Sequence, residues 1–71
     1  MNKIILSDNR EIEVKKATVG MLKTSQQLYK SEIDREIYVV SQCSGLEMPA
    51  VEELELSDYR LLVTAVFDMG K

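Results

Sequence analysis

The stretch CSGLEMPAVEELELSDY, residues 43–59, contains three residues of the kinds that end or begin helices. Gly45 readily adopts the left-handed conformation with which many helices end. Pro49 suits the first turn of a helix, because its φ is helical and the N–H that it lacks would have no partner there. Ser57 is a favoured N-cap. The stretch therefore predicts that one helix ends at Gly45 and that a one-turn helix follows. A last helix then folds back against the helix that ended at Gly45.

A strong helical pattern over residues 31–44 precedes this stretch. Ser31 is the predicted N-cap, and Asp34 stands where a capping box carries an acidic residue. Leu46, directly after the terminal glycine, is expected to pack back on Val40. The predicted buried stripe consists of Ile33, Ile37 and Val40, widened by Val39 and Cys43.

The one-turn helix is expected to begin at Pro49 and to end near Glu55. Glu52 is in its first turn, where negative charge is favoured. Val51 and Leu54 are the residues predicted to point inward.

The last helix is predicted to begin after Ser57 and to end at Gly70. Its apolar stripe consists of Tyr59, Leu62, Val63, Val66 and Met69, with Leu61 and Phe67 on its two margins. This arc is wider than one core contact needs. We therefore predict that the helix serves both core and partner, with Tyr59, Leu62 and Val66 buried and Phe67 and Met69 facing a partner.

The first part of the chain, KIILSDNREIEV at residues 3–14, has the pattern of a β-hairpin. Pairing Leu6 with Ile12 and Ile4 with Val14 places four apolar side chains on one face and leaves the loop 8–10. A two-residue loop would place Leu6 opposite a glutamate, which is a poorer pattern. The longer loop is therefore preferred.

A helix is predicted after the hairpin, with Thr18 as its N-cap. Its inner side is expected to carry Met21, Leu22, Ser25, Leu28 and Tyr29. Neither Gly nor Pro separates this helix from the next one, so a single helix over residues 18–44 is an open alternative. The preferred architecture is one α+β domain, residues 1–71, in which the hairpin is followed by three α-helices with a short helical turn between the last two.

Composition narrows the classes of function. The 71 residues include nine basic and twelve acidic ones, a net charge of −3, which disfavours a phosphate backbone as partner. A single cysteine cannot form an internal disulfide and fits a reducing compartment. No apolar run reaches membrane-spanning length, and the N-terminal segment has no signal-peptide pattern. These features predict a cytosolic protein that binds neither nucleic acid nor membrane.

The chain has few residues of the types that act in catalysis or bind metals. The chain has no histidine, which is the commonest general base and metal ligand. Cys43 lies within an apolar stripe, so it is interpreted as a small buried hydrophobe and not as a nucleophile. The glutamates around Glu53 are interpreted as a solvated helix start, because no calcium-loop pattern accompanies them. We therefore expect no enzyme activity, no catalytic residue, no cofactor and no metal.

Surface apolar residues suggest protein binding instead. Methionine side chains adapt to partners, and aromatic residues outside the core are frequent anchors at interfaces. The candidate partner-binding residues are Phe67, Met69, Leu61, Tyr38 and Met21. The unoccupied surface also predicts self-association at high concentration.

The segments IILSDNREIEV and SGLEMPAVEELELSDYRLLVTAV, with the Thr-Val pair that opens a helix between them, resemble small phage tail assembly chaperones. These form the tail protein E family of Mu-like and related contractile-tailed phages. The shared pattern is a hairpin with a Ser-Asp turn, a helix ending in Gly-Leu, a Pro-Glu-Glu-Leu-like turn and an Asp-Tyr-like start of the last helix. Two positions depart from it: Asn9 replaces the usual hairpin glycine, and Met48 replaces the small hydroxyl residue before Pro49.

The resemblance implies a non-enzymatic chaperone that binds the hydrophobic tape-measure protein and keeps it soluble while the tail tube assembles. It implies that the protein acts in the cytoplasm of the bacterial host and is absent from the finished virion. A small structural or adaptor component of the tail is the alternative. A helix-turn-helix DNA-binding protein is a more remote one, because Arg60 alone would face phosphate beside Asp58 and Asp68.

Overall fold

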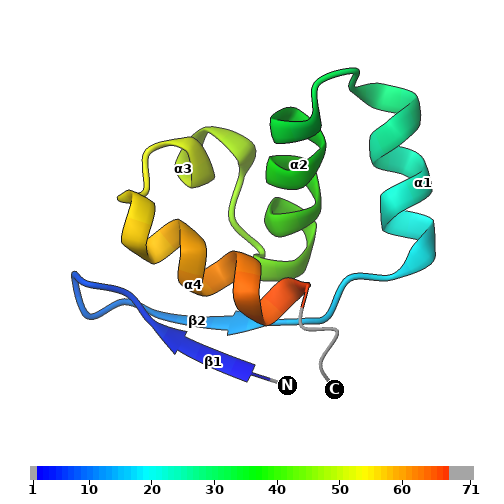
Figure 1. Cartoon of the computed structure of the whole chain (residues 1–71). Coiled ribbons are helices and arrows are strands. Elements are labelled where there is room, and N and C mark those ends of the chain that lie inside the picture. Colours follow the sequence, from blue (N-terminus) through cyan, green and yellow to red (C-terminus); the bar gives the residue numbers. More distant parts are fainter. Residues whose placement is uncertain (1, 68–71) are drawn as a thin grey trace.

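The computed structural model describes residues 2–67 and contains a β-hairpin followed by four helical segments (Figure 1). The predicted α+β class is confirmed, and so is the order of a hairpin, two helices, a short helix and a last helix. The hairpin lies along one side of α4, and α1 and α2 stand side by side (Figure 1). The elements are β1 Asn2–Ile5, β2 Glu11–Val14, α1 Val19–Leu28, α2 Glu32–Ser44, α3 Met48–Glu52 and α4 Leu56–Val66.

The hairpin register differs from the predicted one by two residues. Ile4 pairs with Ile12, and the loop is residues 7–9. The Leu6 N–H donates to the Arg10 carbonyl at 2.9 Å, and the Asn9 N–H donates to the Leu6 carbonyl at 2.8 Å. Asn9 has φ 70°, a left-handed conformation that asparagine adopts more readily than most residues. A shift of two residues preserves the faces of both strands, so the predicted apolar face is retained although its pairing was wrong.

Helix α1 begins as predicted, because the Thr18 hydroxyl accepts a hydrogen bond from the Met21 N–H at 3.2 Å. Its predicted inner side is only partly correct: Ser25 is buried, whereas Leu22 and Leu28 are exposed. The chain leaves the helix at Tyr29, which is extended with φ −133° and ψ 144°. One continuous helix over residues 18–44 is therefore wrong.

Contacts with α2 and α3 hold the break after α1 in place. The Arg35 Nε donates to the Tyr29 carbonyl at 2.8 Å, which satisfies a polar group that the ended helix leaves free. The Tyr29 ring lies 5.7 Å from that of Tyr38, and its hydroxyl donates to the Met48 sulfur at 3.2 Å. Tertiary contacts thus define a helix boundary that no glycine or proline marks.

Helix α2 ends at Gly45, which has φ 79° and confirms the predicted left-handed terminus. Leu46 then packs against the hydrophobic core. At the other end, Ser31 is the N-cap residue, but its side chain makes no capping hydrogen bond. Ile33 is 53% exposed, so its predicted place in the buried stripe is wrong. Val39, Val40 and Cys43 form the buried face, which lies further round the helix and nearer its C-terminal end.

Helix α3 begins one residue before the predicted start, and Pro49 remains in its first turn. Val51 is buried as predicted, and Leu54 packs against the core. Helix α4 begins at Leu56 with Glu55 as N-cap, so the prediction that Ser57 caps it was wrong by two residues. That prediction relied only on the propensity of serine for N-cap positions.

The core lies where the ends of α2 and α4 meet β2. The Lys15 N–H donates to the Cys43 carbonyl at 3.0 Å, and the Ala17 N–H donates to the Val66 carbonyl at 3.1 Å. The segment after β2 thus satisfies terminal carbonyls of two helices. The buried hydrophobic residues are Leu6, Ile12, Val14, Val39, Val40, Cys43, Val51, Leu62, Ala65 and Val66.

Candidate functional site

A groove follows the seam between α2 and α4. It consists of three hollows, of about 360, 210 and 410 Å³. The first and third share Glu36 and Val63, and the second and third share Ile33, Leu56 and Tyr59. The hollows therefore adjoin, and we refer to them together as the α2–α4 groove.

Successive turns of α4 form one wall of the groove. Leu56, Tyr59, Val63 and Phe67 recur at helical spacing and all line it. At a rise of 1.5 Å per residue, the distance from Leu56 to Phe67 along the helix axis is about 16 Å. This length accommodates about three turns of another helix.

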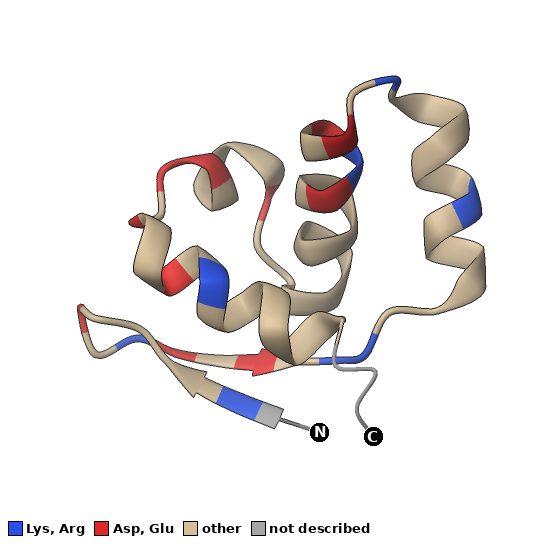
Figure 2. Cartoon of the chain, in the orientation of Figure 1, with Lys and Arg blue, Asp and Glu red and all other residues tan. Residues whose placement is uncertain are grey.

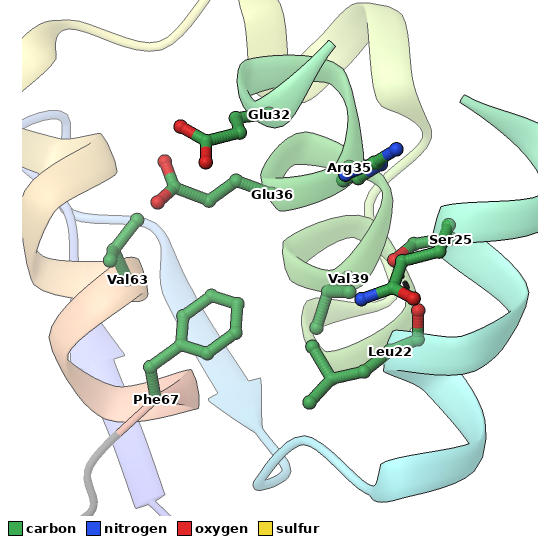
Figure 3. Close-up of a pocket in the computed structure, with 9 residues that line it drawn as sticks. Leu22, Ser25, Glu32, Arg35, Glu36, Val39, Val63 and Phe67 are labelled. Carbon is green, nitrogen blue, oxygen red and sulfur yellow. Dashed lines mark hydrogen bonds between the residues drawn. The ribbon is translucent and has the colours of Figure 1, made fainter. Parts of the chain in front are cut away.

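The opposite wall is formed by α2, with α1 at one end and α3 at the other. Figure 3 shows the Phe67 ring directed into the space between α4 and α2, with Val39 and Leu22 across from it. At the α3 end, Ile33 is 53% exposed and Leu56 is 64% exposed. Two large apolar side chains thus face solvent beside a hollow whose lining includes the buried Val51.

One hydrogen bond crosses the groove. The Tyr59 hydroxyl donates to Glu36 Oε1 at 2.6 Å and so connects α4 to α2. Burial raises the pKa of the Tyr59 hydroxyl above its usual value, and the hydrogen bond to Glu36 and the negative charge of that residue raise it further. Tyr59 was predicted to be core, but it is half-buried and lines two of the hollows.

Acidic side chains gather on the part of the chain that forms the groove. Residues 31–67 contain eight acidic and two basic residues, a net charge of −6, whereas residues 1–30 carry a net charge of +3. Figure 2 shows the acidic positions on the first turns of α2, on α3 and around the start of α4. Acidic residues flank the exposed apolar pair in the sequence: Glu32 precedes Ile33, and Glu55 precedes Leu56.

The opposite side of α4 is closed by the hairpin. Asp58 is 5% exposed, and its carboxylate accepts hydrogen bonds from the Ser7 N–H at 3.1 Å and the Ser7 hydroxyl at 2.8 Å. Leu62 and Val66 follow Asp58 at helical spacing and are also buried. This side therefore belongs to the core and offers no binding surface.

The structure brings one of the five candidate partner-binding residues to the groove, namely Phe67. Leu61 is exposed at 47% on α4, but it is not among the groove residues. Tyr38 packs beside Tyr29, and the Met21 sulfur lies 3.5 Å from the Cys43 sulfur. The fifth candidate, Met69, lies outside the described residues, as does the predicted helix end at Gly70.

Sequence reasoning missed three exposed apolar residues of the groove. Ile33 had been assigned to the core, Leu56 to the connection before Ser57, and Leu22 to the inner side of α1. A signal for one of them was present, because Ile33 lies at the N-terminal margin of a stripe whose other members continue towards the C-terminal end of α2. The exposure of Leu56 depends on where α4 begins, which the sequence pattern placed two residues too late.

The burial of Cys43 is confirmed at 2% exposure. Burial raises the pKa of its thiol, although the charge of Lys15 opposes this shift, so little of the reactive thiolate forms near neutral pH.

Within residues 2–67, no three His, Cys, Asp or Glu side chains come together in a way that could hold a metal ion. In the same part of the chain, the helices lack the length and apolar character needed to cross a membrane.

No family model matches the chain, and the comparisons with curated proteins and with solved structures also find no match.

Proposed function

We propose that this protein is a non-enzymatic tail assembly chaperone that binds helical segments of a tape-measure protein. It would keep that protein soluble in the cytoplasm of a bacterial host while the tail tube assembles, and it would then be released. The proposal combines the resemblance of the sequence to phage tail assembly chaperones with the α2–α4 groove.

The observation that carries the proposal is the exposure of Ile33 and Leu56 beside an apolar groove. An amphipathic helix binds by laying its apolar face into such a groove, with anchors at positions i, i+3 or i+4 and i+7. The groove wall from Leu56 to Phe67 has the length for such a contact. A chaperone of this kind needs only to cover apolar helical surface, so it needs no catalytic group.

The test is co-expression with the tape-measure protein and measurement of the soluble fraction of that protein. Leu56→Glu places a charge in the groove at a residue that is 64% exposed, so the fold should survive. We expect the soluble fraction to fall to the level seen without the chaperone. Leu28→Glu is the matched control, because Leu28 is 58% exposed on α1 and does not line the groove.

Phe67→Glu is a second variant for the same experiment. Phe67 is half-buried and lines the first hollow, so its replacement should remove tape-measure solubility while the thermal melt remains cooperative. If this variant unfolds as a core replacement would, Phe67 belongs to the core and Leu56→Glu alone decides. If the tape-measure protein stays soluble with the Leu56→Glu variant, the binding surface lies elsewhere, with Tyr38 and Met21 as the next candidates.

The alternative, a tail component that remains in the particle, predicts the chain in purified virions, where a released chaperone would be absent. The net charge of −6 over residues 31–67 opposes the DNA-binding alternative.

A further inference from the structure

We infer that the α2–α4 groove selects a helix that carries lysine or arginine beside its apolar stripe, at the end that docks against Ile33 and Leu56. The inference rests on the proposed function, since it specifies the chemistry of the helix that the groove would hold. It follows from the uneven distribution of charge along the groove.

The groove has an acidic end, which we define as Ile33 and Leu56 with the exposed carboxylates of Glu32, Glu52, Glu53 and Glu55. Glu52, Ile33 and Leu56 line the same hollow, and the other three glutamates are sequence neighbours of these residues. Arg60 lines the third hollow with Ile33 and Leu56 and offsets one of these charges. A helix whose apolar side chains contact Ile33 and Leu56 would therefore place its flanking positions near a net negative charge.

The first hollow carries its charge on α2. Glu32, Glu36 and Arg35 line it there, whereas Leu22, Gln26 and Phe67 carry no charge. The Arg35 Nε already donates to the Tyr29 carbonyl, and Figure 3 shows this side chain lying on the α1 side of α2, away from Phe67. The apolar contact continues along the whole groove, but the negative charge is concentrated on the first turns of α2 and beside α3.

The carboxylates are exposed, so each contributes little binding energy alone and the effect is screened by salt. Several of them acting on one segment of a partner should still give a preference of about tenfold for a basic over an acidic flank at low salt. Charge of this kind also speeds association and disfavours acidic partners.

The test uses two synthetic helical peptides with the same leucine stripe, one flanked by lysine and one by glutamate at the same positions. Binding of each labelled peptide to the wild-type protein is measured by fluorescence anisotropy at low and high salt. We expect the lysine peptide to bind about tenfold more tightly at low salt, with the difference shrinking at high salt. Equal affinity of the two peptides at low salt would overturn the inference.

Two variants separate the charge from the apolar contact. The triple variant Glu52→Gln, Glu53→Gln, Glu55→Gln should keep the affinity for the glutamate peptide or raise it, and should abolish most of the preference. Leu56→Glu should weaken both peptides, whereas the control Leu28→Glu should leave both affinities unchanged. A preference that survives the triple variant would contradict the assignment of the acidic end.

A second copy of this chain is the competing occupant, because residues 1–30 carry a net charge of +3. Sedimentation of the wild type and of Leu56→Glu, with and without the lysine peptide, distinguishes the two. If the wild type forms oligomers that are lost in Leu56→Glu but are not dissociated by excess lysine peptide, the inference is overturned. Peptide selectivity and tape-measure solubility are separate readouts, so failure of the inference can be distinguished from failure of the proposed function.

Discussion

On one side of α4, Leu62 and Val66 are sealed within the core, whereas on the other side Tyr59 and Val63 line an open groove beside α2. Both stripes are apolar and recur at the same spacing, so the helix itself does not explain the difference. The closed side has the hairpin against it, and Asp58 secures the contact by accepting two hydrogen bonds from Ser7. Within residues 2–67, the open side has two walls and no third element across its mouth.

The comparison shows that the width of the apolar stripe on a helix does not determine how much of that stripe will be buried. A chain of 71 residues has few elements with which to cover a wide stripe. The hairpin can cover one side of α4, and the other side is left for a partner or for solvent. Four predictions test whether the two sides differ in energy as they do in geometry, in order from the largest expected effect to the smallest.

Leu62→Ala should cost about 2–5 kcal/mol of unfolding free energy, because Leu62 is 0% exposed and its truncation leaves a cavity. The matched change on the open side, Leu56→Ala, should stay within about 0.5 kcal/mol. Urea denaturation of both variants measures the contrast. Similar losses from the two would show that the groove is part of the core.

Asp58→Ala should cost about 2 kcal/mol, because it removes two hydrogen bonds that the buried Asp58 carboxylate accepts from Ser7. Glu52→Ala, at an exposed carboxylate of the groove, is the control and should be near neutral. A double-mutant cycle with Ser7→Ala isolates the side-chain part of the contact. A coupling energy near zero would mean that the bond between the Ser7 hydroxyl and Asp58 does not stabilise the hairpin contact.

Gly45→Ala should cost about 1 kcal/mol, because an L side chain is disfavoured at φ 79°. No atom lies within 4 Å of the position of an added Cβ, so the cost is conformational and not steric. Gly45→Asn should therefore lose less than Gly45→Ala, since asparagine tolerates this conformation better. Equal thermal midpoints for all three proteins would show that the turn between α2 and α3 tolerates another geometry.

Tyr59→Phe should cost about 1 kcal/mol or less at pH 7, where it removes the hydrogen bond to Glu36 across the groove. The raised pKa of Tyr59 adds a dependence on pH. The folded state holds the phenolic proton more tightly than the unfolded state does. This contribution is complete below the usual tyrosine pKa of 10.0 and is lost as the pH rises towards the higher pKa of the folded state.

Urea denaturation at pH 8 and at several values above pH 10 measures this loss. Other groups also titrate there, so the relevant quantity is the difference between the wild type and Tyr59→Phe. We expect this difference to shrink as the pH rises above 10. A constant difference would mean that Tyr59 does not gain its raised pKa from the groove.

The elements of this fold were largely predictable where a residue acts through its own backbone preference. Thr18 caps α1 and Gly45 ends α2 because these effects are local to one turn of helix. The start of α4 was misplaced because Ser57 has the propensity for a cap but the chain is already helical there. The hairpin pairing was off by two residues because both registers place the same apolar residues on the same face.

The candidate site was less predictable than the fold. Phe67 was expected to face a partner, and it lines the groove. Ile33 and Leu56 were not expected to do so, because their exposure depends on where α2 and α4 cross. Periodicity identifies an apolar stripe, but it does not state which neighbour covers which part of it.

By itself, the sequence determined the class of the fold, the order of its elements, the burial of Cys43 and the left-handed turn at Gly45, since each follows from propensity or from period. Only the tertiary structure decided that α1 ends at Tyr29, that Asp58 binds Ser7, and that the second side of α4 stays open. These features depend on contacts between residues far apart in the chain. No local preference encodes such contacts, because their free energy exists only once the elements have come together.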